Sequence, residues 1–248
     1  MTDYFIDFFK ALDRQGPGDD KYTELACNLL DFLPANPRIL DVGCGTGRQT
    51  LALARIAPSE ITAVDIYDSF LNKLNENAKM ETLKGTITTL NASMFELPFE
   101  DATFDLIWSE GSIYIMGFEK GLQEWKQLLK PGGYLVVSEI TWLRQDIPAE
   151  IRDYWVTAYP EIGTVSEKLS VIERCGYQSL AHLTLPEYGW QQNYYDLMEA
   201  QKRDFLDQYG DAEEARDIVE NELEMENNLY KKYKDYYSYV FYIMKRTK

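Results

Sequence analysis

The chain has 248 residues, enough for one large domain or for a core domain with an appendage. Its 41 acidic side chains outnumber its 25 basic ones and give a formal net charge of -16, which argues against binding to nucleic acid or to an anionic membrane. The sequence contains no apolar run near the roughly 20 residues of a membrane span, and its first residues lack the features of a signal peptide. We therefore expect a cytoplasmic protein with neither nucleic acid nor a membrane as partner.

Cysteine and histidine are too sparse to predict a disulfide framework or a metal site. Cys27, Cys44 and Cys175 lie far apart in the chain, and the single histidine, His182, stands in a strand-like run. A metal site needs several converging ligands. We expect free thiols, a structural His182, a Cys44 that packs as a small residue between glycines, and no metal.

Apolar runs of strand length alternate with helical stretches up to about residue 140. After a short aromatic helix near the start, the pattern predicts strands at 38–43, 60–66, 85–93, 104–111 and 134–140, with helices at 48–58, 69–80 and 121–129. This alternation is typical of βαβ units and a parallel sheet.

Beyond residue 140 the pattern predicts a helix over 165–175 that ends at Gly176, a strand over 178–186 and a last strand over 236–246. The intervening segment is rich in Tyr, Glu and Gln and has helical periodicity, so we interpret it as a helical insertion that covers one end of the sheet. We expect a single domain made of an N-terminal helical segment (1–36), a core sheet (37–187), a helical insertion or lid (188–233) and the last strand (234–248).

The stretch ILDVGCGTG, residues 39–47, places three glycines in five positions directly after an apolar strand. A phosphate-binding P-loop requires a lysine that this loop lacks, and a dinucleotide site would bring its pyrophosphate against Asp41. The same carboxylate suits a ligand with a positive charge, and the glycines let the backbone approach it closely. Asp65, at the end of the second strand, is placed to accept both hydroxyls of a ribose. A cationic group and a ribose without a phosphate predict S-adenosylmethionine.

Five separated motifs between Ile39 and Ile140 resemble those of the class I S-adenosylmethionine-dependent methyltransferases, in the branch of small-molecule enzymes. They are LDVGCGTG, VDI, NASMFELPF, FDLIWSEG and LLKPGGYLVVSE, in the order that the family has. With the seven expected strands, the resemblance implies an α/β fold: a Rossmann-like, doubly wound, seven-stranded and mostly parallel sheet with an antiparallel last strand, an N-terminal lid helix and a helical insertion before the last strand.

The resemblance also implies which residues bind the cofactor. The amino-acid end of S-adenosylmethionine is expected against the glycine loop, the ribose on Asp65, and the adenine on Ile66 and Met94. Ser93 stands where the family usually has an aspartate that accepts from the adenine amino group, so we expect weaker cofactor binding. The full set of expected cofactor-binding residues is Arg14, Asp41, Gly43, Gly45, Thr46, Gly47, Asp65, Ile66, Ser93, Met94 and Glu110.

Methyl transfer is an in-line displacement at an already activated carbon, so the protein mainly supplies position. Glu110 and Tyr114 are the candidate catalytic residues, should a base be needed. We expect a small-molecule acceptor in a pocket lined by aromatic residues from Tyr114, Trp142, Trp155, Trp190, Tyr194 and Tyr195, and a homodimer as the candidate assembly.

Two alternatives stay open at this point. A protein methyltransferase predicts an open acidic groove in place of a closed aromatic pocket. A non-catalytic S-adenosylmethionine-binding protein predicts a donor site beside a collapsed acceptor pocket.

Overall fold

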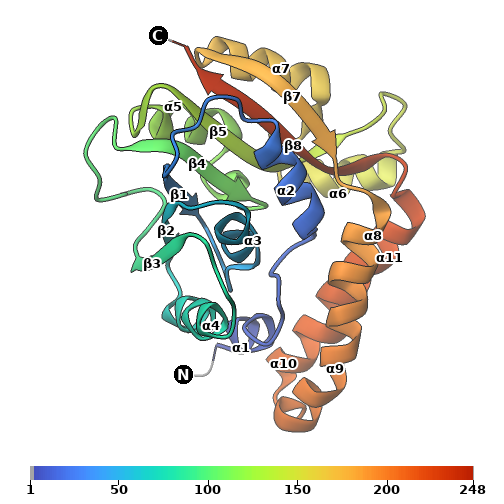
Figure 1. The fold of residues 1–248 in the computed structure, drawn as a ribbon. Coiled ribbons are helices and arrows are strands. Elements are labelled where there is room, and N and C mark those ends of the chain that lie inside the picture. Colours follow the sequence, from blue (N-terminus) through green and yellow to red (C-terminus); the bar gives the residue numbers. More distant parts are fainter. Residues whose placement is uncertain (1–2, 248) are drawn as a thin grey trace.

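A single mixed sheet forms the centre of the computed structural model, which describes residues 3–247 (Figure 1). Residues 1–2 and 248, which belong to the expected first and last segments, lie outside this range. The strand order is β3-β2-β1-β4-β5-β8-β7, with β6 paired only to β5. The strands are β1 (Arg38–Val42), β2 (Glu60–Asp65), β3 (Thr86–Asn91), β4 (Phe104–Glu110), β5 (Leu129–Trp142), β6 (Gly163–Thr164), β7 (Tyr177–Thr184) and β8 (Tyr237–Arg246).

The pairing confirms the mostly parallel sheet with an antiparallel last strand. Strands β1 to β5 pair in parallel, whereas β8 runs antiparallel to both of its neighbours, β5 and β7. The two-residue β6 is an eighth strand that the sequence pattern does not predict. Because β1, β2 and β4 are parallel, their carboxyl ends meet at one edge of the sheet, where ligands bind in open α/β folds.

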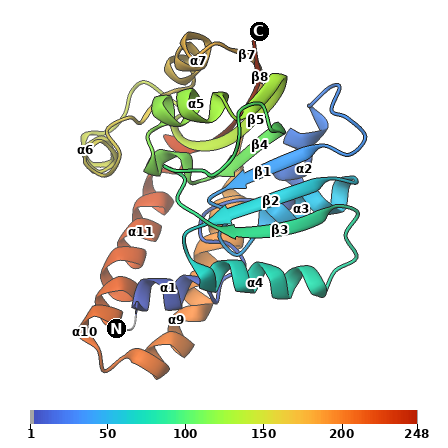
Figure 2. The same ribbon diagram turned by 90° about the vertical axis from the view of Figure 1, so that its left-hand side faces the viewer.

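Helices cover both faces of the sheet, because successive strand residues point to opposite faces and both sets are apolar. The helices of this part are α1 (Tyr4–Phe9), α2 (Asp20–Asn28), α3 (Arg48–Ile56), α4 (Asp68–Lys79), α5 (Phe118–Lys126), α6 (Ala149–Ala158) and α7 (Val165–Arg174). Ile39 belongs to an apolar cluster with α2 and α3, whereas its neighbour Leu40 belongs to a second cluster with α5 and α7. Figure 2 shows these two helical layers on either side of the strands.

A second group of helices, which follows β7 and precedes β8 in the chain, projects from one end of the sheet. Helix α1 lies beside this group in both views. The Phe8 ring of α1 packs edge-on against Phe205 of α9 (Asp196–Tyr209) with centroids 5.2 Å apart. None of the helices in residues 3–247 combines the length and apolar character that crossing a membrane requires. The group consists of α8 (Glu187–Trp190), a π-helical turn (Gln191–Tyr195), α9 (Asp196–Tyr209), α10 (Glu213–Asp217), a second π-helical turn (Ile218–Leu223) and α11 (Glu224–Tyr233).

The helix expected over 165–175 is confirmed, and its ends show why the sequence predicts it. Thr164 and Glu167 form a reciprocal capping box at the start of α7, and Gly176 follows its end with φ +78°. By contrast, α6 has no counterpart among the expected elements. It buries only Ile151 completely, so its sequence carries a weak amphipathic pattern.

A buried ion pair ties α7 to the central strand β5. Lys168 Nζ donates to Glu139 Oε1 at 3.0 Å, and the two side chains are 3% and 1% exposed. The ammonium also lies 4.3 Å from the centroid of the Phe118 ring. Burial raises the pKa of Glu139, and the charge of Lys168 opposes that rise.

Breaking this pair on one side should strongly destabilise the fold. Glu139→Leu leaves the Lys168 ammonium buried without its counter-charge, and we expect the free energy of unfolding to fall by about 3–5 kcal/mol. The double variant Glu139→Leu/Lys168→Met removes both charges and should recover most of that loss. Urea unfolding followed by circular dichroism measures both, and equal losses in the single and double variants would contradict this account.

Candidate functional site

The glycine loop after β1 lies against three other segments of the chain. Gly43 and Gly45 have φ +70° and +55°, values that favour glycine over other residues. A Cβ on Gly43 would lie 2.5 Å from Ser112 Oγ, and one on Gly45 would lie 2.2 Å from Gln15 Oε1. The backbone N–H of Gly43 donates to Val64 O at 2.8 Å, which holds the loop on β2. The absence of a side chain at Gly43 and Gly45 therefore lets Ser112 and Gln15 lie directly against the backbone of the loop.

Asp65 ends β2 beside this loop and stiffens it. Its carboxylate accepts from the backbone N–H groups of Gly45 at 2.9 Å and Tyr67 at 3.0 Å. Burial raises the pKa of Asp65, and these backbone hydrogen bonds oppose the rise. The next side chain, Ile66, is 54% exposed although it is large and apolar. An apolar side chain left open beside a fixed carboxylate is a typical feature of a ligand pocket.

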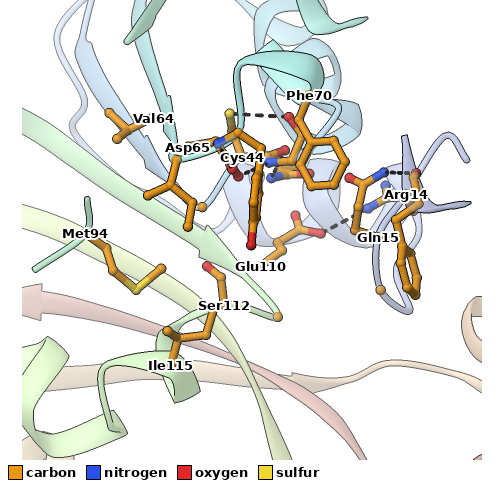
Figure 3. A pocket seen from close by; sticks show the side chains of 18 of the residues that line it. Arg14, Gln15, Cys44, Val64, Asp65, Phe70, Met94, Glu110, Ser112 and Ile115 are labelled. Carbon is orange, nitrogen blue, oxygen red and sulfur yellow. Dashed lines mark hydrogen bonds and ion pairs between the residues drawn. The ribbon is translucent and has the colours of Figure 1, made fainter. Parts of the chain in front are cut away.

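Glu110 ends β4 and faces the N-terminal segment. It accepts from Thr23 Oγ1 at 2.7 Å, Trp108 Nε1 at 2.9 Å and Arg14 Nη1 at 3.3 Å. Figure 3 shows the Arg14 and Glu110 side chains pointing toward each other. Burial raises the pKa of Glu110, and the Arg14 charge opposes that rise. Arg14 also donates to Asp20 at 2.7 Å, so this arginine links the N-terminal segment to the end of the sheet.

Gln15 is a site residue that the sequence reasoning missed. Its Oε1 accepts from the backbone N–H of Thr46 at 2.8 Å, and its Nε2 donates to Phe9 O at 3.0 Å. One side chain thus fastens the glycine loop to the end of α1. The surrounding turn, DRQGPG, marks a change of direction, but the sequence does not reveal what the turn contacts.

These segments enclose a first cavity of about 370 Å³. The sequence did not single out Phe70 and Ser112, which also line it. Most of the expected cofactor-binding residues meet here, namely Arg14, Gly43, Gly45, Asp65, Ile66, Ser93, Met94 and Glu110, together with Tyr114.

Asp41, Thr46 and Gly47 do not line the first cavity. Asp41 is fully buried behind the glycine loop, where it accepts from Thr50 Oγ1 of α3 at 2.5 Å. The Thr46 hydroxyl donates to Asp13 O at 2.9 Å, and Gly47 faces Leu74 of α4. All three residues stand behind the wall of the cavity, because the loop turns away from the sheet edge into α3.

A second cavity of about 320 Å³ adjoins the first. Phe5, Phe9, the Gln15–Pro17 turn, Gly111 and Tyr114 line both. The second cavity extends from there between α6 and the helices that follow β7. Trp155, Trp190, Tyr194 and Tyr195 line it as the sequence reasoning expected, whereas Trp142 lies elsewhere, packed edge-on against Tyr237.

Comparison with known protein families assigns the segment of the chain that begins in β1 and ends within β5. Residues 40–137 match the family model described as "Methyltransferase domain". The chain contains a class I S-adenosylmethionine-dependent methyltransferase domain. The matched range begins in β1 and ends within β5, so it holds the glycine loop, Asp65, Met94 and Glu110, while α1 and the helices after β7 lie outside it.

Individual relatives agree with this assignment. The chain is 27% identical to 27-O-demethylrifamycin SV methyltransferase of Amycolatopsis mediterranei over 130 residues, which are 51% of this chain and 48% of the relative. It is 34% identical to the ubiquinone/menaquinone biosynthesis C-methyltransferase of Proteus mirabilis over 134 residues, 52% of this chain and 53% of the relative. The chain thus spans about half the length of these curated relatives.

The fold as a whole resembles solved methyltransferase structures. A methyltransferase from Geobacter sulfurreducens, in complex with S-adenosylhomocysteine, has a TM-score of 0.82 at 18% identity, covering 98% of both chains. At that identity the likeness concerns the fold, including the segments that flank the methyltransferase domain model.

The carboxyl group of Asp41 should make the stability of this domain depend on pH. Burial first, and then the charges of Glu110 and Asp65, raise its pKa to about 7 against the opposing hydrogen bonds from Thr50 and Gln49. A folded-state pKa above the unfolded value of 3.8 stabilises the fold at low pH, and this stabilisation is lost as the pH rises toward 7.

The matched variant Asp41→Asn lacks this titration. The free energy of unfolding of the native protein minus that of Asp41→Asn should fall by about 4 kcal/mol between pH 4 and 7 and stay level above, since one pKa unit equals about 1.4 kcal/mol. Urea unfolding of both proteins at each pH measures the difference. A difference that does not change with pH would mean that Asp41 is ionised in the folded protein.

Proposed function

We propose that this protein is an S-adenosylmethionine-dependent methyltransferase that transfers a methyl group to a small-molecule acceptor by in-line displacement. The observation that carries the proposal is the meeting of two cavities at Gly111 and Tyr114, next to the carboxyl ends of β1, β2 and β4. A donor in the first cavity would have its reactive end at this junction, and an acceptor in the second cavity would approach it from the far side.

The residues of the first cavity suit S-adenosylmethionine. We assign Asp65 to the ribose hydroxyls, Ile66 and Met94 to the faces of the adenine, and Ser93 to its edge. Gly43 and Gly45 leave no side chain between the backbone and a ligand, and their contacts with Ser112 and Gln15 keep that backbone in place. We assign Arg14 and Glu110 to the carboxylate and the ammonium of the methionine end.

When bound, S-adenosylmethionine would supply a methyl group already activated by its sulfonium. The protein then has to align the acceptor and exclude water, which is worth roughly 7–11 kcal/mol in well-oriented reactions. Three donors occupy the Glu110 carboxylate, which suits a positioning role for it. Tyr114 lines both cavities and is the better placed of the two candidate catalytic residues.

A small-molecule acceptor suits the second cavity better than either alternative. A protein methyltransferase is expected to have an open acidic groove for its substrate. The second cavity is instead lined mostly by aromatic side chains and lies between α6 and the helices after β7. A non-catalytic protein would be expected to fill the acceptor space with side chains. The names of the two relatives given above describe methyltransferases of a rifamycin and of quinones, which are small molecules. A cytoplasmic location, a homodimer and the absence of a nucleic acid partner stay predictions.

The donor assignment is tested at Asp65. A carboxylate that holds a ribose contributes two charge-assisted hydrogen bonds, so Asp65→Ala should weaken the binding of S-adenosylmethionine and S-adenosylhomocysteine about 100-fold. Isothermal titration calorimetry measures both affinities. Asp101→Ala, on an exposed turn outside the cavity, is the control and should bind like the native protein.

Because Asp65 also supports the glycine loop, the Asp65→Asn variant separates ligand binding from folding. The amide retains the size and one acceptor oxygen, so the fold should persist by circular dichroism while the affinity still falls. Native-like affinity in both Asp65 variants would overturn the assignment of this residue.

A further inference from the structure

Aromatic side chains form most of the wall of the second cavity. Eleven of its nineteen lining residues are Phe, Tyr or Trp, and Glu226 of α11 is the one charged side chain among those described. Aromatic rings present a negative face that attracts cations, and the attraction grows when the cation loses its water. The composition of this wall therefore bears on the charge of the acceptor.

The rings are held in place by packing and by hydrogen bonds to their edges. Trp190 stacks on Tyr230 with centroids 4.7 Å apart, and its Nε1 donates to Ser238 Oγ at 2.9 Å. On the side of the first cavity, Tyr114 meets Tyr159 edge-on at 6.0 Å. The wall is thus rigid at both ends, which reduces the entropy lost when a ligand binds.

A π-helical turn adds two adjacent rings to the same wall. In a regular helix, consecutive residues point about 100° apart, so two neighbours share one surface only where that surface is broad. Here Tyr194 and Tyr195 both line the second cavity, from the π-helical turn Gln191–Tyr195. Such turns occur frequently at functional sites.

Glu226 places a negative charge among these rings. It is half-buried, and it accepts a hydrogen bond from Tyr154 Oη at 3.2 Å. Burial first, and the Glu226 charge second, raises the pKa values of Tyr114 and Tyr194, so both phenols stay neutral near pH 7. A carboxylate beside neutral rings favours a cation in the cavity.

The described part of the same wall offers no positive charge to an anionic group. Among the described lining residues there is no Lys, Arg or His. The nearby Lys168 stands behind Tyr159 and is neutralised by Glu139 at 3.0 Å. A carboxylate or phosphate on the acceptor would lose its hydration here without a compensating charge, which is strongly unfavourable.

We propose that the methyl acceptor is an amine that enters the second cavity as an ammonium cation, held by the aromatic wall and by the carboxylate of Glu226. This inference rests on the proposed methyltransferase function and names its substrate class. Before transfer, the ammonium proton passes to the Glu226 carboxylate. The nitrogen lone pair then forms the new N–C bond while the S–C bond of the donor breaks, and its electron pair stays on the sulfur as a neutral thioether.

The charge of the ligand is tested with one pair of equal shape and two further cations. Choline and its neutral isostere 3,3-dimethyl-1-butanol, with tetramethylammonium and benzyltrimethylammonium as smaller and larger cations, are titrated into the full chain saturated with S-adenosylhomocysteine. Trp155 and Trp190 line the cavity, so their fluorescence reports binding, and calorimetry checks it. We expect at least one of these cations to bind at least about tenfold more tightly than the neutral isostere.

Glu226→Gln should reduce this preference to about threefold or less, because the rings remain and the counter-charge is gone. Glu224→Gln is the matched control on the same helix, since Glu224 is exposed and pairs with Lys202 on the surface. It should keep the full preference. Circular dichroism of both variants checks that the helix is intact.

Equal binding of the cations and the neutral isostere, or no binding of any of them, overturns the amine proposal. A preference that survives Glu226→Gln unchanged overturns the role of Glu226. The titration with S-adenosylhomocysteine alone is a separate readout. If the donor product does not bind, the proposed function fails, whereas binding of that product without a cation preference leaves the proposed function standing and removes only this inference.

Discussion

The tight loop between β1 and α3 is the constraint on which the rest of the site depends. Gly43 and Gly45 adopt left-handed backbone conformations and lie so close to Ser112 and Gln15 that a Cβ at either position would collide with its neighbour. This closeness joins the ends of β1, β2 and β4 to the N-terminal segment. The first cavity therefore has one wall of bare backbone, which a side chain at the same positions would close.

Two kinds of polar contact hold the N-terminal turn in place against the first cavity. Gln15 fastens the N-terminal turn to the loop through the neutral backbone N–H of Thr46, whereas Arg14 connects the same turn to the buried carboxylate of Glu110. Because removing two charges from water is costly, a buried ion pair of this sort is weak evidence for net stability. The N-terminal turn lines both cavities, so one segment contributes to the wall of each.

The sequence predicts the sheet and the site residues near strand ends because both depend on local order. The alternation of strand and helix patterns along the chain predicts a parallel sheet. Because parallel strands end at the same edge of the sheet, Asp65, Ile66 and Glu110 come together there. Residues whose role depends on a distant partner were missed, as with Gln15, which contacts a loop about thirty positions away. The same limit applies to Glu226, because helix packing alone brings it among the aromatic rings. Thr46 and Gly47 lie in the expected motif, yet the direction in which the loop turns places them behind the wall.

The two cavities meet at Gly111 and Tyr114, and a crystal structure of the full chain with S-adenosylhomocysteine would show whether the reactive end of the donor lies at this junction. We expect adenosine in the first cavity, with the ribose on Asp65, and the sulfur at the junction facing the aromatic wall of the second cavity. Density for the ligand outside the first cavity, or a sulfur directed away from the second cavity, would contradict it.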